Sequence, residues 1–194
     1  MLLAAFRRAG FSVALSQGMR PKPVISLAMA RSVGMASNDE LLTVELVGEH
    51  DPDSVGMRLA ETLPRGFGVV SASRSTGTPR LVGARYRVEL DASPDLVEQA
   101  AALYATAAEA PVERRSPKKA KTVDVKAYAP SVEVVDGGFE VEVAVSHEGS
   151  ARPEEIARAL AAQVGSDLPV TGVVRLELRV AERQIAVSAP GETP

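Results

Sequence analysis

The order in which strand-like and helical patterns follow one another constrains the fold more than any other feature of this sequence. In the second half, strand-like alternation at residues 81–90 precedes a helical pattern at 93–109, and a second helical pattern at 152–164 precedes a closing strand at 172–180. Between the two helices, alternating residues on both sides of Asp136-Gly137-Gly138 predict a β-hairpin. This β-α-β-β-α-β order is typical of a split βαβ, or ferredoxin-like, unit.

The first 74 residues repeat part of the same order. Helical patterns cover residues 1–9 and 51–63, and strand-like patterns cover residues 11–15, 24–29, 41–47 and 67–73. No strand-like run precedes the first helix, so this repeat lacks its first strand. We therefore expect an α+β protein with two tandem ferredoxin-like units, at residues 1–74 and 80–188, and a frayed tail at 189–194. The neighbours of the absent strand would have unpaired backbone groups, so we expect either another segment in its place or a less stable first unit.

Composition excludes several kinds of chemistry. The chain has no cysteine, which rules out a disulfide, a thiol nucleophile and cysteine-bound zinc or iron-sulfur clusters on this chain. It has two histidines, His50 and His147, and we expect neither a metal site nor a cofactor on this chain. Aromatic residues make up 4% of the sequence and fall mostly in apolar patterns, which argues against a surface that stacks unpaired bases.

Positive charge is concentrated in one stretch of the second half of the chain, whose remainder is acidic. The formal net charge is −3, but residues 111–128 contain six basic and two acidic side chains. The basic side chains include Arg114, Arg115, Lys119 and Lys121. A local basic patch on an acidic body suits the binding of phosphate groups, and the alternative interpretation is the solvated tip of a hairpin.

A second basic segment is a connection stiffened by proline. Residues 16–26 read Ser-Gln-Gly-Met-Arg-Pro-Lys-Pro-Val-Ile-Ser. Each proline fixes its own φ and restricts the residue before it, so the loop can hold Arg20 and Lys22 in a fixed direction. That direction suits an anion such as a phosphate or a carboxylate, although solvated surface is the commoner role of a basic turn. The predicted loop framework consists of Ser16, Gly18, Pro21, Pro23 and Ser26.

Two features of the sequence concern its location. No apolar run approaches the roughly 20 residues that a membrane-spanning helix needs. The first 37 residues contain five basic and no acidic side chains, as transit peptides do, but their helical and strand-like patterns favour a folded segment. We therefore expect a cytoplasmic protein with no membrane partner.

Two stretches carry a family resemblance. Residues 6–10 read Phe-Arg-Arg-Ala-Gly, and the Pro-rich residues 16–26 follow them. Together they resemble the signature of an uncharacterised bacterial family whose members are fused to, or encoded beside, a B12-binding radical SAM protein. Further agreements lie at Gly34, residues 37–46, residues 112–126 and residues 150–153. Three departures are Met19 in place of Phe, Val24 in place of Lys or Arg, and the absence of the family's N-terminal strand with its Ser-His-x-Asp segment.

The resemblance implies a context more than a chemistry. It implies a radical SAM protein as the partner of this chain. Some family members are encoded beside a ribonuclease and ribosomal proteins, which implies a role in RNA metabolism. At the level of fold alone, paired ferredoxin-like units with a basic cleft also resemble RNA-processing proteins of the CRISPR repeat-cleaving type.

Three hypotheses follow. We favour an accessory module that binds RNA backbone or another substrate for a radical SAM partner, through Arg20, Lys22, Arg114, Arg115, Lys119, Lys121 and Arg152. The second is an enzyme that acts alone on RNA; its acid-base group would come from His50, His147 or Asp124, and the sequence contains no recognisable catalytic arrangement. The third is a protein adaptor or scaffold, which accounts for everything except the clustering of basic residues.

Overall fold

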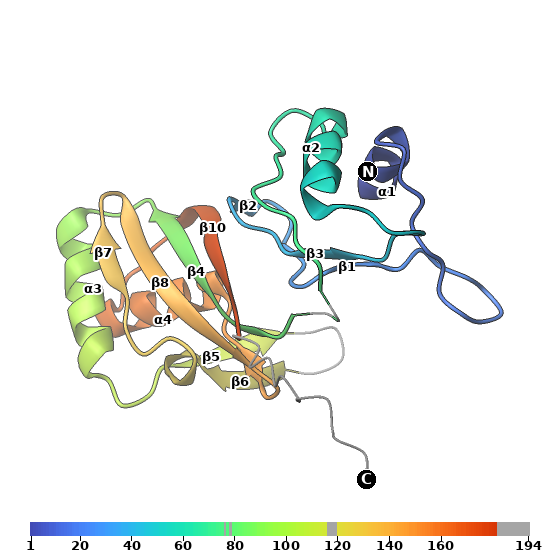
Figure 1. Cartoon of the computed structure of the whole chain (residues 1–194). Coiled ribbons are helices and arrows are strands. Elements are labelled where there is room, and N and C mark those ends of the chain that lie inside the picture. The colour runs from blue at the N-terminus through green and yellow to red at the C-terminus, as the bar shows by residue number, and fades with distance from the viewer. Residues whose placement is uncertain (76, 78, 116–119, 182–194) are drawn as a thin grey trace, which may run out of the picture. The chain divides into compact units, whose positions relative to one another are not determined.

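The chain divides into two units, and a short segment from its first half belongs to the second unit (Figure 1). The structure, a computed structural model, describes residues 1–75, 77, 79–115 and 120–181, with only the backbone of Arg115. The first unit contains Met1–Ala30 and Glu40–Pro79, and the second contains Arg31–Asp39 and the chain from Arg80 onward. The frayed tail that we expected at residues 189–194 lies outside the described residues.

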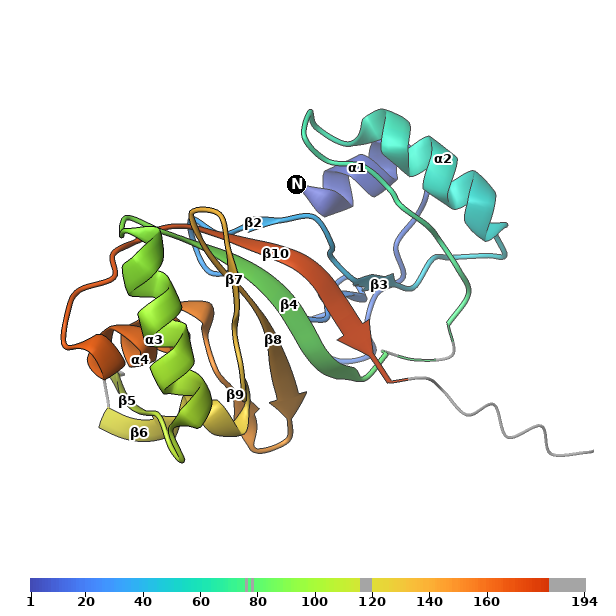
Figure 2. The same ribbon diagram turned by 90° about the vertical axis from the view of Figure 1, so that its left-hand side faces the viewer.

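The second unit is built on an antiparallel sheet. Its strands are β4 (Leu81–Leu90), β7 (Glu133–Val135), β8 (Gly138–Ser146) and β10 (Val170–Val180), in the order β10-β4-β8-β7. The sheet is extended by β2 (Ala36–Ser37), parallel to β10, and by β9 (Gly149–Ser150), which pairs with the end of β8. Helices α3 (Pro94–Thr106) and α4 (Pro153–Val164) lie together on one face of the sheet (Figure 2).

Alternation along the strands explains how this sheet meets the helices. Side chains of successive strand residues point to opposite faces, and every second residue near the middle of β4 and β8 is buried, including Val88 and Phe139. The helix residues Tyr104, Ile156 and Leu160 are also completely or almost completely buried. The main elements follow the order β4-α3-β7-β8-α4-β10, as the sequence pattern predicted.

A separate hairpin follows α3. Its strands β5 (Pro111–Arg115) and β6 (Ala120–Asp124) pair antiparallel, and the register places Arg114 opposite Lys121. Val112 and Val123, also opposite each other, are both buried. A short 3-10 helix, η1 (Val125–Ala127), then begins the return of the chain to β7.

The first unit has a smaller core. Helices α1 (Leu2–Arg8) and α2 (Pro52–Thr62) accompany a two-stranded antiparallel sheet of β1 (Ile25–Leu27) and β3 (Leu42–Val44). The buried core residues are Ala5, Phe6, Ala9, Phe11 and Leu59. Helix α2 begins where the sequence predicted, because the Asp51 carboxylate accepts a hydrogen bond from the Ser54 N–H at 2.9 Å.

Some expected strands of the first unit are absent from the structure. Residues 11–15 contribute only two isolated bridges, Val13 to Leu46 and Leu15 to Pro23, and residues 67–73 form no strand. The mixed α+β class is confirmed, whereas the tandem ferredoxin-like arrangement is not, because the described part of the first unit contains one two-stranded sheet. A strand needs a neighbouring strand to satisfy its backbone, and alternation alone does not supply one.

The segment at residues 31–39 differs most from the predicted domain boundaries. We expected it inside the first unit, at residues 1–74, but it lies along β10 of the second unit. The Asn38 N–H donates to the Arg175 carbonyl at 2.8 Å, and the Leu178 N–H donates to Asp39 Oδ2 at 2.8 Å. These bonds satisfy one edge of β10, so a long-range pairing decides where the segment belongs.

No helix in the described residues is both long enough and apolar enough to cross a membrane.

Candidate functional site

Arg114 lies at the centre of the basic residues that the structure brings together. Its guanidinium binds the Glu155 carboxylate through two hydrogen bonds, Nε to Oε1 at 2.6 Å and Nη2 to Oε2 at 2.5 Å, and Nη2 also donates to the Ser150 carbonyl at 2.8 Å. Glu155 is in the first turn of α4 and its side chain is 2% exposed. The pair therefore joins strand β5 to the start of α4.

This ion pair shifts the pKa of both partners. The hydrogen bond to Glu155 raises the pKa of Arg114, which stays charged. Burial alone raises the pKa of Glu155, but the hydrogen bonds from Arg114 and from the Arg152 N–H, at 2.9 Å, outweigh burial and hold that pKa below its usual value. Two further cations lie beside the pair: Lys121 is opposite Arg114 on β6, and Arg152 is the residue before α4.

We define the cation cluster as Arg114, Lys121 and Arg152. Lys121 and Arg152 are exposed, and neither forms an ion pair with a carboxylate in the described part of the chain. Two other predicted members cannot be placed, because Lys119 and the Arg115 side chain lie outside the described residues. The structure thus brings three of the seven predicted binding residues together on the second unit.

Asp124 and Lys126, which follow Lys121 in the chain, both have structural partners. The Asp124 carboxylate accepts hydrogen bonds from the Ala110 N–H at 2.8 Å and the Lys126 N–H at 3.1 Å. The Lys126 ammonium donates to the carbonyls of Tyr104 and Ala105 near the end of α3. Asp124, one of the possible catalytic bases, is therefore occupied in holding the backbone.

The two histidines lie in different units. His50 Nε2 is 2.9 Å from the Val47 carbonyl, and its ring meets Phe11 edge to face. His147 is exposed and lies 4.0 Å from the Glu148 carboxylate. No group of three potential metal ligands occurs in the described residues. Neither histidine contacts a second acid-base residue in a catalytic arrangement within the part of the chain that the structure describes.

The Pro-rich connection is a projecting loop of the first unit (Figure 1). Ser16 closes it twice: its N–H donates to the Lys22 carbonyl at 2.7 Å, and its Oγ accepts from the Lys22 N–H at 3.0 Å. Gly18 has a φ of 139°, which explains the glycine in this framework. Arg20 and Lys22 are exposed, and so is the whole side chain of Met19. Ser16 therefore closes the loop and Gly18 supplies its left-handed turn, and the functional role of this framework stays a prediction.

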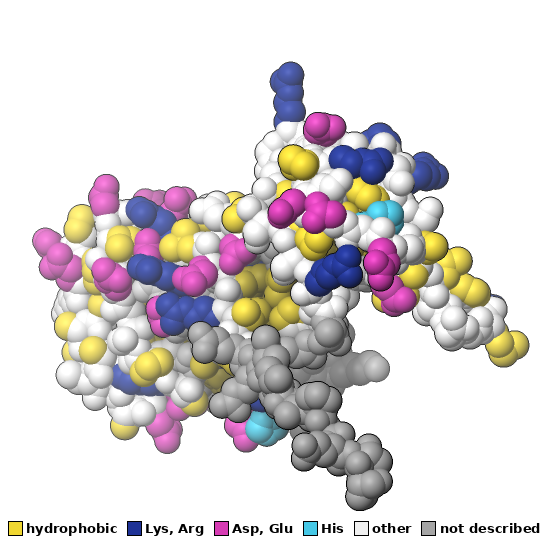
Figure 3. Space-filling model, viewed as in Figure 1, with side chains coloured by type: hydrophobic (Ala, Val, Ile, Leu, Met, Phe, Trp, Pro, Cys, Tyr) yellow, Lys and Arg dark blue, Asp and Glu magenta, His cyan; other side chains and the backbone are white. Residues whose placement is uncertain are grey.

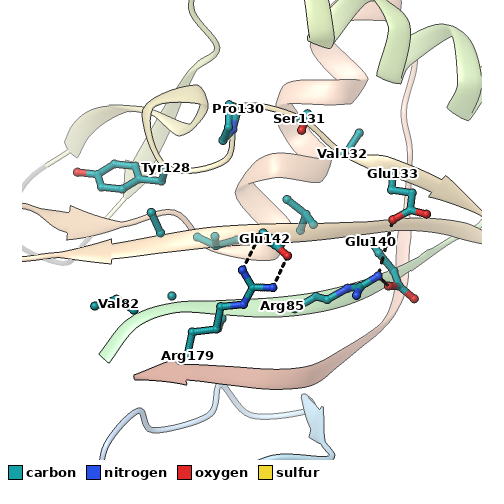
Figure 4. Close-up of a pocket in the computed structure, with 15 residues that line it drawn as sticks. Val82, Arg85, Tyr128, Pro130, Ser131, Val132, Glu133, Glu140, Glu142 and Arg179 are labelled. Atoms are coloured by element: carbon teal, nitrogen blue, oxygen red, sulfur yellow. Dashed lines mark hydrogen bonds and ion pairs between the residues drawn. The ribbon is translucent and has the colours of Figure 1, made fainter. Parts of the chain in front are cut away.

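A cleft of about 570 Å³ opens beside β8 in the second unit (Figure 4). Its charged side chains form two groups: Arg179 binds Glu142 at 2.7 and 2.5 Å, and Arg85 lies 2.6 Å from Glu140 and 3.7 Å from Glu133. Segment 128–133 forms the opposite wall, with Tyr128, Pro130, Ser131 and Val132. The sequence indicated only that alternate residues of β4 are charged, because the partners on β8 and β10 meet β4 through long-range pairing.

The open face of the main sheet is a mixed-charge surface. It carries Arg85 and Arg87 of β4 opposite Glu142 and Glu140 of β8, and Tyr86 and Phe139 are buried on the other face. Figure 3 shows basic and acidic side chains interleaved on one face of the second unit. The described strands offer no row of exposed aromatic rings, so this sheet is not a platform for stacking bases.

Sequence reasoning missed Glu155, the residue that orients Arg114. The available signal was its position three residues after Arg152, at the start of a predicted helix, where a carboxylate can accept a backbone N–H. Nothing local in the sequence indicates that the same carboxylate also binds Arg114, 41 residues earlier. The ion pair is a consequence of tertiary packing.

Comparisons with known proteins identify the family and nothing closer. No curated protein and no solved structure matches the chain significantly. Residues 1–153 match the model of a family described as an uncharacterized protein conserved in bacteria (DUF2344). This match covers the projecting loop, the β5–β6 hairpin and Arg152. The chain therefore belongs to the DUF2344 family.

Proposed function

We propose that this chain is an accessory module that binds the phosphate backbone of RNA through the cation cluster and serves a radical SAM enzyme. The observation that carries the proposal is that Arg114 and the Arg152 N–H bind the buried carboxylate of Glu155, while Lys121 is opposite Arg114 on β6. Glu155 neutralises one of the three charges and fixes Arg114, so Lys121 and Arg152 remain available to phosphate. Such contacts position a nucleic acid without reading its sequence.

Several features favour binding over catalysis. The candidate bases Asp124 and His50 are hydrogen-bonded to backbone groups, and His147 stands on an exposed turn. The open sheet face lacks stacking aromatics among its described residues, so the proposed binding is mainly electrostatic. A module that only binds RNA backbone needs a partner to act on the RNA. Membership of the DUF2344 family is compatible with a radical SAM partner.

A second part of the proposal concerns the fold of the two units. We propose that the second unit follows the ferredoxin-like plan, and that the first unit is an incomplete version of it. The strand order β10-β4-β8-β7, with helices α3 and α4 as crossovers, supports the plan in the second unit. The α1, α2 and β1–β3 elements support it only in part in the first unit.

Binding of fluorescently labelled single-stranded RNA, followed by anisotropy at low salt, tests the site. We expect the double variant Lys121→Ala with Arg152→Ala to bind about ten-fold more weakly than the parent chain. The matched control is Arg87→Ala with Arg179→Ala, which removes two positive charges from ion-paired positions on the sheet face. Equal weakening by both double variants would show a general charge effect and would remove the cation cluster as a site.

The partner needs a separate experiment. The radical SAM protein encoded by the same genome would be purified and mixed with this chain, with and without RNA, in analytical ultracentrifugation. We expect a complex that forms with both the parent chain and the RNA-binding variant, because the proposed RNA contacts are distinct from the protein contacts. Failure of the two proteins to associate under either condition would contradict the accessory role, whatever the outcome of the RNA measurement.

A protein adaptor is the second candidate function, and the projecting loop favours it. Met19 is fully exposed near the tip of a loop that Ser16 holds closed. A stiff loop with an exposed apolar side chain loses little entropy when it binds a partner. If RNA does not bind at low salt, while Met19→Ser weakens the association with the radical SAM protein, the adaptor function would replace the RNA-binding function.

A further inference from the structure

The cleft beside β8 exists because segment 128–133 separates from this strand. The segment is held at both ends: the Ala144 N–H donates to the Tyr128 carbonyl at 2.8 Å, and Glu133 pairs with Glu140. Between these two contacts, the segment advances five residues, from Tyr128 to Glu133, while β8 advances only four, from Glu140 to Ala144. The extra residue forces the segment to bulge away from β8. Pro130 lies in the bulge and has no N–H to donate to β8.

The bulge leaves main-chain groups of β8 directed into the cleft. Hydrogen-bonding groups alternate along an antiparallel strand, and the Ala144 N–H points toward segment 128–133. The N–H and the carbonyl of Glu142, two residues earlier, therefore point the same way. No hydrogen bond in the described structure joins them to the residues of the bulge. One donor and one acceptor thus lie beside the charged side chains.

The charged side chains of the cleft come from four different strands, β4, β7, β8 and β10. Arg179 on β10 is opposite Gly83 on β4, and Gly83 has no side chain that would block its path. The Arg179 guanidinium therefore reaches across β4 and binds Glu142 on β8 with two hydrogen bonds (Figure 4). Both side chains are about half exposed, so solvent weakens the pair and a ligand can displace it.

The charges select for a particular kind of ligand. The lining contains two arginines, Arg85 and Arg179, and three carboxylates, Glu133, Glu140 and Glu142, so neither a polyanion nor a polycation is favoured. A small molecule with adjacent positive and negative groups can bind both members of the Arg179–Glu142 pair at once. A volume of about 570 Å³ lies in the range of small-molecule sites.

We propose that this cleft binds a small zwitterion of the α-amino acid class. The ligand carboxylate binds the Arg179 guanidinium, and the ligand ammonium binds the Glu142 carboxylate. The ligand side chain lies against Tyr128, Pro130 and Val132, which form the less polar wall. This site is separate from the cation cluster, so it does not depend on the RNA-binding proposal.

Chemical-shift titration of the full isotope-labelled chain with glycine, L-alanine and L-leucine tests the proposal. We expect saturable shifts at β8 and segment 128–133, with an affinity that rises by about ten-fold from glycine to L-leucine as the side chain covers the apolar wall. Acetate has only the carboxylate of the ligand and ethylammonium has only its ammonium group. We expect each to bind at least about ten-fold more weakly than L-alanine.

Variants of the charged pair complete the test. We expect Arg179→Gln and Glu142→Gln each to weaken L-leucine binding by about ten-fold or more, and Arg179→Lys to do the same because it loses the two-pronged contact. Arg87→Gln is the matched control, since Arg87 is also on the open sheet face but does not line the cleft. Circular dichroism checks that every variant is folded.

Three results would overturn the proposal. The first is the absence of shifts at about 10 mM amino acid. The second is acetate binding equal to L-alanine binding, which would show an anion site. The third is equal weakening by the Arg87 control, which would show a general effect of surface charge.

Discussion

The two units differ in how much of their apolar surface they bury. The second unit buries large side chains completely, including Phe139, Ile156 and Leu160. The first unit has five buried core residues and exposes large apolar side chains, which include Met1, Leu3, Leu15, Met19, Leu27, Val47, Met57, Phe67 and Val70. Since burial of apolar surface is the main favourable term in folding, the second unit is expected to be the more stable of the two.

This difference suggests a division of labour. The second unit holds its site residues on strands and helices whose backbones are packed on a core, as in the Arg114–Glu155 pair between β5 and α4. The first unit presents Arg20 and Lys22 on a loop that is closed locally by Ser16. Precise positioning of charge is therefore expected in the second unit, and adaptable contacts are expected in the first.

Matched core substitutions would sharpen the comparison most. Phe139 in the second unit and Phe6 in the first are both essentially fully buried. We expect Phe139→Ala and Phe6→Ala each to cost about 3–5 kcal/mol in their own unit. In calorimetry, Phe6→Ala should lower only the midpoint temperature of the first unit, which unfolds earlier. Phe139→Ala should lower only the midpoint temperature of the second unit, which unfolds later. A single transition that moves equally with either substitution would contradict separate stabilities.

Loss of the buried carboxylate should weaken the second unit next most strongly. We expect Glu155→Gln to cost about 2 kcal/mol, because it removes the charge that Arg114 and the Arg152 N–H bind. Urea unfolding, followed by the NMR signals of residues in the second unit, measures this loss of unfolding free energy. Asp95→Asn in the first turn of α3 is the control for loss of an exposed helix carboxylate.

The same residue gives the second unit a dependence on acid. The pKa of Glu155 is lowered in the folded state, so its contribution to stability is present above the unfolded pKa of about 4.3 and is lost as the pH falls through the folded value. Unfolding free energies measured between neutral and acid pH should therefore converge for the parent chain and Glu155→Gln. Curves that stay parallel would show that the carboxylate is not bound as described.

Tyr104 gives the second unit a dependence of stability on alkaline pH, with a smaller effect than that of Glu155. Its hydroxyl donates to the Ala129 carbonyl at 2.6 Å, and burial followed by the Asp124 charge raises its pKa to about 12. We expect Tyr104→Phe to cost about 1 kcal/mol. The folded state favours the neutral phenol, so the contribution of Tyr104 to stability is fully present below about pH 10 and is lost as the pH rises from about 10 to 12. The variant Tyr104→Phe should lack this fall in unfolding free energy.

Loss of a helix cap should have the smallest effect and should be confined to the first unit. Asp51 accepts the Ser54 N–H at the start of α2. We expect Asp51→Ala to cost about 0.5 kcal/mol, with a smaller loss for Asp51→Ser, which can still cap the helix. Amide hydrogen exchange should speed up in the first unit and stay unchanged in β4 and β8. Faster exchange in those strands would show that the two units share one unfolding transition.

Local patterns in the sequence were enough to predict most elements of the second unit. Alternation in β4 and β8, Pro94 and Pro153 at helix starts, and the Asp136-Gly137-Gly138 turn all rest on interactions between near neighbours. The same reasoning failed for residues 67–73, where alternation occurs without a partner strand. It also placed residues 31–39 in the wrong unit, because pairing with β10 depends on contacts about 140 residues away.

Some features of the candidate sites could be predicted from the sequence, and others depend on tertiary packing. Basic residues and the closed Pro-rich loop were visible as a run of cations and as a pattern of Ser, Gly and Pro. Glu155 beneath Arg114, and the cleft between β8 and segment 128–133, come from the packing of distant segments. Sequence spacing gives the residue types available for binding, and tertiary structure decides which of them are free to bind.

The most direct test of the central claim is the slope of RNA affinity against salt concentration, for the parent chain and for Lys121→Ala with Arg152→Ala. Each phosphate contact with a single strand contributes a slope of about −0.7 in logarithmic units, so the double variant should be shallower by about 1.4. That result would establish Lys121 and Arg152 as phosphate contacts of the second unit. Identical slopes, or affinity that does not change with salt, would contradict the proposed role of the cation cluster.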